Sequence, residues 1–170
     1  MEADVPVLLK GIDGILAHRG FLLGRSSWLD IDPEMVYAFE RVLAFDEPTD
    51  IRARWTGAVA DQVPCYLLVS LVLPMLREIY VLEDTAQGMH SGIDSLCFLA
   101  PVPERSSVRL AATLEDVRSL GGGWELALAC VMECDAVSTP VLSAKVRFRF
   151  EICKPGTTAD FAVKMGVRAG

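Results

Sequence analysis

The segment VPCYLLVSLVLPML, residues 63–76, is the most apolar run of the chain and decides its fold. Its fourteen residues would extend about 21 Å as a helix, which is short of the ~30 Å of a bilayer core. Because the run is apolar on nearly every side, it predicts a buried helix over about residues 58–81 that other parts of the protein surround. We therefore expect no membrane-spanning segment.

Length and charge narrow the class of protein. The chain has 170 residues, a net charge of −7 and 52% hydrophobic residues, which predicts one globular domain with a sizeable core. Lysine and arginine are scattered singly, so we expect neither nucleic acid nor an anionic membrane surface as a partner. The apolar excess instead requires a large subunit interface or an internal apolar cavity.

The amino-terminal sequence and the cysteines bear on compartment and cofactors. Residues 1–20 carry two acids before the first base and break their apolar stretch with charges, unlike a secretory signal, so we expect a cytoplasmic protein. The five cysteines form no Cys-x-x-Cys pair, and the chain has only two histidines. Zinc-ligand spacing is therefore absent, and we expect no metal or cofactor.

Two further helices are predicted before the apolar run. The first lies within residues 5–23, where two glycines leave its limits open. The second has Asp32 as its capping residue and Pro33 at its first position, and apolar residues at helical spacing carry it to about Phe45. An acidic, proline-containing turn follows at residues 46–50.

Beyond Gly88 the apolar period changes from helical to two, which predicts strands. Residues 108–115 and 124–134 are two such segments, separated by the Gly-rich turn at 120–123, and a turn at 135–140 leads to a third at 142–150. Short turns between long strands indicate an antiparallel meander. The economical arrangement is an α+β domain, residues 1–153, whose curved sheet wraps around the apolar helix, with a C-terminal tail at 154–170.

At residues 88–103, GMHSGIDSLCFLAPVP, the sequence resembles a segment of the MaoC-like dehydratases, a branch of the hotdog-fold proteins. That segment opens with Gly-x-Asn-x-Gly and runs into Phe-x-Ala-Pro-Val. Residues 27–32 and 39–46 resemble the family's lead-in helix, and residues 70–74 its central helix. The resemblance spans about residues 20–151 and implies a hotdog fold, an antiparallel sheet around a long central helix. Since the edges of such a sheet should be paired, we also expect a homodimer.

The resemblance also implies a chemistry. MaoC-like enzymes hydrate or dehydrate acyl thioesters with an Asp and a His five residues later, while a backbone N–H at the start of the central helix polarises the thioester carbonyl. Here Asp46 matches the Asp, but Ile51 stands at the histidine position and cannot transfer a proton. At the entry to the central helix, Cys65 keeps its N–H, whereas Pro64 removes a neighbouring donor.

The candidate catalytic residues are Asp46, Tyr66 and His90, which stands at the family's Asn position. For each a structural alternative stays open: a solvated turn carboxylate, a packed ring and a structural histidine, respectively. Residues expected to line the substrate pocket are Trp55, Cys65, Ser70, Met89 and Phe98.

Three functions remain open. The leading hypothesis is an enzyme of polyketide or related secondary metabolism that holds a long apolar acyl or polyene chain, free or carrier-bound, beside the helix at 63–76 and promotes a lyase or cyclisation step. Shape and orientation would then supply much of the rate, since proximity alone can contribute about 7–11 kcal/mol. The first alternative is an (R)-specific enoyl-thioester hydratase or dehydratase that uses Asp46 and His90. The second is a noncatalytic partner subunit of an active hotdog chain.

Overall fold

A computed structural model of the chain describes residues 5–43 and 62–153. Its helices are α1 (Gly11–Ala17), α2 (Pro33–Leu43) and α4 (Cys65–Ile79). Its strands are β1 (Val7–Lys10), β2 (Leu22–Arg25), β3 (Leu29–Asp30), β4 (Tyr80–Glu83), β5 (Thr85–Phe98), β6 (Ser107–Leu120), β7 (Gly123–Cys134) and β8 (Val137–Ile152).

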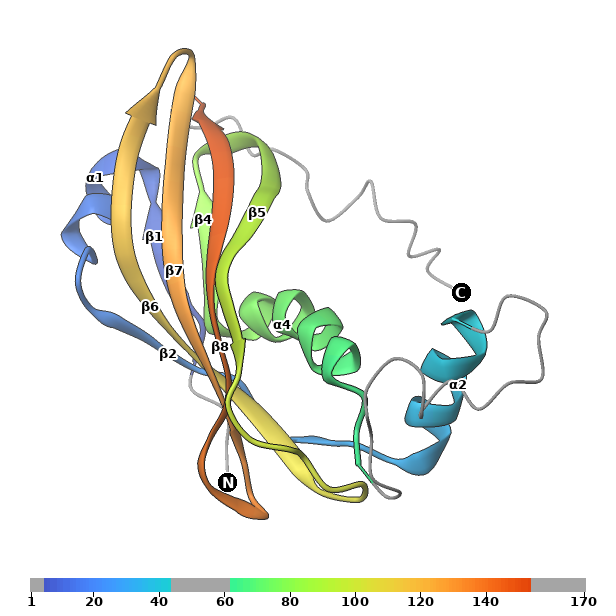
Figure 1. The fold of residues 1–170 in the computed structure, drawn as a ribbon. Coiled ribbons are helices and arrows are strands. Elements are labelled where there is room, and N and C mark those ends of the chain that lie inside the picture. Colours follow the sequence, from blue (N-terminus) through green and yellow to red (C-terminus); the bar gives the residue numbers. More distant parts are fainter. Residues whose placement is uncertain (1–4, 44–61, 154–170) are drawn as a thin grey trace, which may run out of the picture.

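The long strands form one curved antiparallel sheet in the order β2-β6-β7-β8-β5, with β3 also paired to β6 (Figure 1). The predicted meander is confirmed as β6-β7-β8. Its first hairpin closes through a two-residue loop in which Gly122 has φ 96°, a conformation that favours glycine. The second turn is shorter than predicted, because residues 137–140 already belong to β8.

Two strands lie outside this sheet. β1 and β4 pair in parallel and form a small sheet of their own, beside α1. The helix predicted within residues 5–23 is therefore only partly correct, since the helical part is limited to α1 and strands flank it on both sides.

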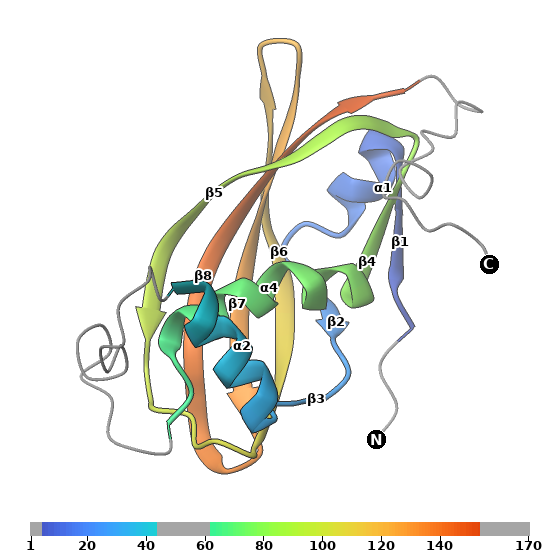
Figure 2. The same ribbon diagram turned by 90° about the vertical axis from the view of Figure 1, so that its right-hand side faces the viewer.

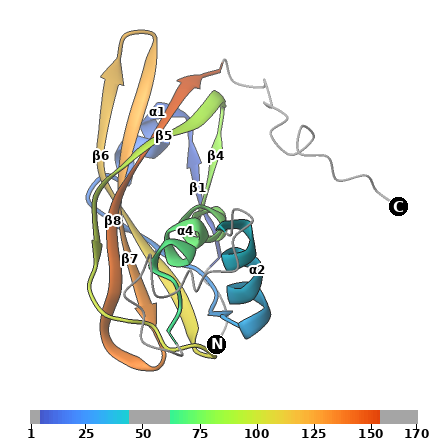
Figure 3. The ribbon, with the colours of Figure 1, turned by 45° about the vertical axis from the view of Figure 1, so that its right-hand side comes forward.

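Helix α4 crosses the concave face of the main sheet, and α2 lies on the side of α4 away from the sheet (Figures 2 and 3). Helix α4 packs on β6, β2 and β4 through its buried residues, which are Leu67, Leu68, Val72, Met75, Leu76 and Ile79. The prediction of a sheet wrapped over an apolar helix is thus confirmed in arrangement.

The predicted extent and burial of the central helix are corrected. The helix begins at Cys65, directly after Pro64, and Tyr80 and Val81 belong to β4 rather than to the helix. Nor is it covered all round: Tyr66 is 60% exposed, and Ser70 and Arg77 are exposed as well. The described residues therefore leave one side of this apolar helix uncovered.

The capping prediction for α2 is confirmed, since the Met35 backbone N–H donates to Asp32 Oδ1 at 2.6 Å. The expected end of that helix near Phe45 and the expected tail at 154–170 lie outside the described residues. Over the described ranges, no helix has both the length and the apolar character needed to cross a membrane.

Candidate functional site

The open side of α4 carries a polar stripe. Tyr66, Ser70 and Arg77 are separated by four and seven residues, so they share one helix face. Ser70 turns its hydroxyl back onto its own helix and donates to the Leu67 carbonyl at 2.6 Å. Tyr66 and Arg77 are therefore the members of this stripe whose polar ends extend away from α4.

The strand that faces this stripe is β5, and its register decides which of its side chains point toward α4. His90, Ile93 and Phe98 lie opposite Phe148, Val146 and Leu142 of β8, whose side chains belong to the core. Side chains that are directly opposite in a sheet lie on the same face. His90, Ile93 and Phe98 therefore point to the helix side.

Met89 is not brought together with these residues. It lies opposite Arg149, on the outer face of the sheet, and its side chain is 60% exposed. Adjacent residues of a strand point to opposite faces, so Met89 and His90 cannot line the same surface of this sheet. The expected pocket residue Met89 thus lies apart from the others within one chain.

The stripe of α4 and the helix-side residues of β5 together form what we call the α4–β5 surface. At one end of this surface, Tyr66 contacts Phe98. Their rings are 5.8 Å apart and nearly perpendicular, at 74°, which is a favourable edge-to-face contact. Cys65, a half-buried free thiol, precedes Tyr66 as the first residue of α4. Three of the predicted site residues therefore lie together at the amino-terminal end of the helix.

This helix end is also open to a ligand oxygen. No side chain of the described residues caps α4, and its capping position is Pro64, which has no N–H. The Leu67 N–H is bonded to the Pro64 carbonyl, at 3.0 Å. The backbone N–H groups of Cys65 and Tyr66 are the remaining donors of the first turn, where the helix dipole favours a developing negative charge.

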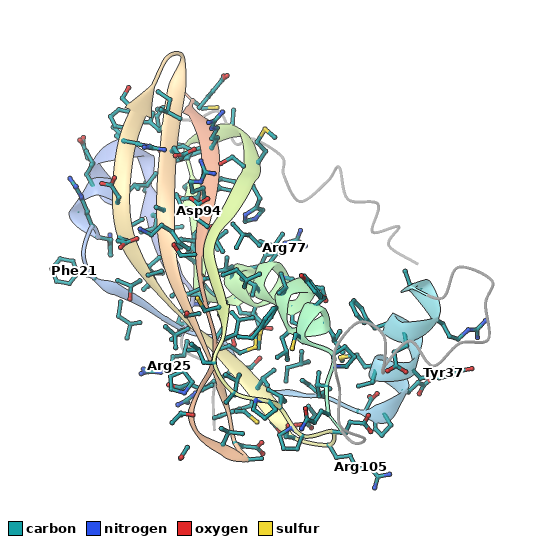
Figure 4. The ribbon with its side chains drawn as sticks, viewed as in Figure 1. Phe21, Arg25, Tyr37, Arg77, Asp94 and Arg105 are labelled. Carbon is teal, nitrogen blue, oxygen red and sulfur yellow. The ribbon has the colours of Figure 1, made fainter. Side chains whose placement is uncertain are left out.

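At the other end, His90 lies against Phe148 with the ring centres 4.9 Å apart. Phe148 occupies space that a side chain at residue 88 would need, because a Cβ on Gly88 would clash with the Phe148 ring. Burial, and secondly the charge of Arg77, hold the pKa of His90 below its usual value. Arg77 itself extends from the last turns of α4 on the side of β5 (Figure 4).

The structure does not bring Tyr66 and His90 together. Eleven residues separate Tyr66 from Arg77, which is about 16 Å of helix. Eight residues separate His90 from Phe98, about 26 Å of strand before the bulges are counted. One substrate carbon cannot be within proton-transfer distance of both Tyr66 and His90 of a single chain.

Asp46 and Trp55, together with Ile51, lie outside the described residues. The segment that contains them ends directly before Gln62, which forms an isolated bridge with Pro103 next to the start of α4. No group of His, Cys, Asp or Glu side chains suited to a metal ion occurs in residues 5–43 and 62–153.

A second polar cluster, which sequence analysis missed, lies on the outer face of the sheet. Glu125 is only 2% exposed there and accepts hydrogen bonds from Arg118, from Arg149 at 3.0 Å and from Ser91 at 3.3 Å. Burial would raise its pKa, but the bonds from Arg118 and Arg149 outweigh burial and hold the pKa below the usual value. Cross-strand pairing of Glu125 with these two arginines was the signal that could have revealed it.

A hollow of about 410 Å³ adjoins this cluster, and its walls are Asp94, Glu115, Asp116, Arg118, Glu125, Ala127, Lys145 and Arg147. Most of its charges are already paired. Arg147 contacts Asp94 at 2.7 Å, and Lys145 contacts Glu115 at 2.7 Å. Gly92 leaves room for the Arg147 guanidinium, which would lie 2.8 Å from a Cβ at that position. We therefore interpret the hollow as a surface whose charges are largely paired and whose ion pairs link neighbouring strands.

No family model matches the chain. It is 23% identical over 145 residues to 3-hydroxyacyl-thioester dehydratase Z of Mycobacterium tuberculosis, an alignment that covers 83% of this chain and 96% of the relative.

Similar solved structures include a monoamine oxidase regulatory protein from Archaeoglobus fulgidus, with a TM-score of 0.65, 13% identity and coverage of 91% of this chain and 100% of that one. A MaoC-like dehydratase from Rhodospirillum rubrum matches with a TM-score of 0.55 and 13% identity, and the match covers 77% of this chain and 90% of that one. The HadBC (3R-hydroxyacyl-ACP dehydratase) complex of Mycobacterium tuberculosis matches with a TM-score of 0.56 and 17% identity. The match covers 78% of this chain and 96% of that one. The chain has the predicted hotdog fold, and its resemblance to MaoC-like dehydratases is confirmed.

Proposed function

We propose that this hotdog-fold chain acts on acyl thioesters as a hydratase or dehydratase, with the acyl chain lying along the α4–β5 surface. The observation that carries the proposal is the uncapped start of α4 beside the exposed Tyr66–Phe98 pair, which offers backbone donors for a thioester carbonyl next to an apolar wall. The similarity to a 3-hydroxyacyl-thioester dehydratase over most of both chains supports the same chemistry.

In this proposal the carbonyl oxygen accepts from the Cys65 and Tyr66 N–H groups, which stabilise the enolate-like charge that develops when the C2 proton leaves. Asp46 serves as the acid–base group, and the Tyr66 hydroxyl holds the water that is added or lost. His90 has no part in that step, because it lies at the far end of the surface. The Asp46/His90 pairing that the sequence suggested is thereby replaced by Asp46 and Tyr66.

The test measures hydration of a series of trans-2-enoyl thioesters, which is detected as a loss of enoyl absorbance. Removing a positioned acid–base group typically costs a factor of 10²–10⁴, so we expect Asp46→Asn to lose at least a hundredfold in kcat. Tyr66→Phe should lose about tenfold or more. His18→Gln, which changes the chain's other histidine, directly after α1, is the matched control and should be unaffected. Absence of turnover with every chain length would overturn the proposal.

A noncatalytic subunit is the second candidate, because Ile51 cannot replace the family's histidine and the matched HadBC structure is a complex. It is distinguished by co-purification with a second hotdog chain, together with enoyl-thioester turnover that appears only in the mixture and survives Asp46→Asn. Retention of activity by the isolated chain would exclude it.

A lyase or cyclisation step on a polyketide or polyene chain is a third candidate. It rests on the apolar helix alone, and the comparisons favour the hydratase or dehydratase over it. Incubation with a linear polyene thioester and mass spectrometry separates the two: an isomeric product of unchanged mass indicates cyclisation, whereas loss or gain of 18 Da (water) indicates a dehydratase or hydratase.

We also propose a homodimer in which β5 is covered by a second copy. β5 is an edge strand, and both of its faces carry exposed apolar residues, with Met89 on the outside and Ile93 and Phe98 on the helix side. A ligand on the helix side cannot cover Met89, whereas a second chain paired along the edge of β5 covers it and leaves the helix side for the ligand. Light scattering should give a dimer mass for the wild type and a monomer mass for Met89→Lys/Ile93→Asp.

A further inference from the structure

The carboxy-terminal end of the α4–β5 surface carries an exposed arginine, Arg77, although the chain has a net charge of −7. Arg77 is exposed and extends on the side of β5 (Figure 4). His90 is exposed on β5, on the face of the sheet that is turned toward α4. The register of β5 and the direction of Arg77 set these two side chains on facing walls of the surface. Burial and, after it, the charge of Arg77 lower the pKa of His90, and the effect of Arg77 agrees with this placement.

No described carboxylate balances this charge. Residues 65–76 of α4 include no Asp or Glu, and the helix-facing residues of β8 are Leu142, Ala144, Val146, Phe148 and Phe150. Glu78, which follows Arg77 in sequence, is turned away and accepts from the Ser27 N–H at 2.9 Å. The helix-facing side chains of β8 and of β5 near this end of α4 are therefore apolar apart from His90.

We propose that Arg77 and His90 bind an anionic oxygen group, a carboxylate or a phosphate, at the far end of a long ligand whose apolar part lies along α4 and β5. The identity of that ligand as an acyl thioester rests on the proposed function. Arginine suits this role because its planar guanidinium offers two parallel N–H donors to a carboxylate or phosphate. His90 adds a ring N–H from the opposite wall.

The position of the site fixes the shape of the ligand. Arg77 lies about 16 Å along the helix from Tyr66, where the thioester is proposed to bind. The anionic group is therefore remote from the reacting carbons. It belongs either to a long acyl chain that ends in a carboxylate or to the phosphate of coenzyme A or a phosphopantetheine arm.

The kinetic test uses Arg77→Gln with Arg41→Gln as its matched control, because Arg41 is the arginine in the last turn of α2. Four thioesters are compared: a C14 enoyl chain with and without a terminal carboxylate, each attached to coenzyme A and to N-acetylcysteamine, which lacks phosphate. We expect Arg77→Gln to raise KM at least tenfold with kcat little changed. If KM rises only for the carboxylate-ended chains, the bound anion is the end of the acyl chain. If KM rises only for the coenzyme A thioesters, the bound anion is the phosphate. If Arg77→Gln has the same KM as the wild type for all four thioesters, the proposal is overturned.

A binding test separates this inference from the proposed function. Titration of the His90 ring by NMR is followed in the presence of tetradecanedioate, tetradecanoate or inorganic phosphate. An anion held at Arg77 and His90 should raise the pKa of His90 in the wild type and leave it unchanged in Arg77→Gln. If no thioester is turned over but dianionic ligand or phosphate still shifts His90 through Arg77, only the proposed function fails. If thioesters are turned over and no anion shifts His90, only this inference fails.

Discussion

Glu125 provides the sharpest test of the electrostatics of this sheet. Its carboxylate is almost fully buried on the outer face, and Arg118 and Arg149 donate to it from the two neighbouring strands, with Ser91 as a further donor. Glu125→Gln keeps the shape of the side chain but removes the charge to which both arginines are bonded. We expect the variant to fold with a lower free energy of unfolding.

The magnitude follows from the exposure of the partners. Breaking a fully buried ion pair costs about 3–5 kcal/mol. Here the arginine side chains are 56% and 54% exposed, so they recover water when the carboxylate is lost. We therefore expect a loss of about 2–4 kcal/mol, since hydrogen bonds to charged groups contribute about 1.5–3 kcal/mol each. At about 3 °C per kcal/mol for a chain of this size, the melting temperature should fall by about 6–12 °C.

The measurement is urea unfolding followed by circular dichroism, with Glu133→Gln as control. Glu133 lies on the same strand and face and contacts Arg109 at 2.6 Å, but its side chain is 34% exposed, so its loss should cost about 0.5–1 kcal/mol. Because folding lowers the pKa of Glu125, its contribution is present above the usual value of 4.5 and is lost as the pH falls through the lower folded value. The difference in free energy of unfolding between the wild type and Glu125→Gln should therefore shrink as the pH falls below 4.5. A loss no larger than that of Glu133→Gln, or one independent of pH, would refute this reasoning.

Three further predictions concern stability. Asp32→Ala removes the side-chain acceptor at the start of α2 and should cost about 1 kcal/mol in urea unfolding. Gly88→Ala places a Cβ against the Phe148 ring and should cost about 1–3 kcal/mol, with altered NMR signals from the His90 ring that packs on Phe148. Because folding lowers the pKa of His90, the unfolded chain binds more protons below about pH 6.5, so wild-type stability should fall from pH 7.5 to 5.5. His90→Gln should show a smaller fall, and so should Arg77→Gln; equal slopes in all three proteins would contradict the assignment.

The meander and the central helix could be predicted because each is encoded by local pattern. Buried residues alternate with less buried ones over residues 108–114 of β6, 126–134 of β7 and 142–146 of β8, and a Gly-Gly pair closes the first hairpin. β5 could not be recognised in full, since its register against β8 shifts at three places and Ser95 has a positive φ. Each bulge moves the next side chain to the other face, which destroys the period of two on which strand prediction depends.

The site was predictable residue by residue but not as an arrangement. Tyr66 and Phe98 were both selected as site residues, and they do meet, because the start of α4 lies over the end of β5. His90 was selected for its chemistry, yet no sequence pattern measures how far along the crossing of helix and strand it lies from Tyr66. The outer-face carboxylate of Glu125 was missed for a related reason, since its partners come from adjacent strands and only the pairing register brings them together.

The separation of Tyr66 from His90 also changes what the apolar excess of the chain requires. A short enoyl group bound at the start of α4 would leave Ile93 and the far half of the helix side of β5 uncovered. A ligand long enough to reach Arg77 would bury that surface and would pair its anionic end with the unbalanced positive charge. Chain length and terminal charge therefore act together: the apolar wall favours the long chain, and Arg77 with His90 favours the one that ends in an anion.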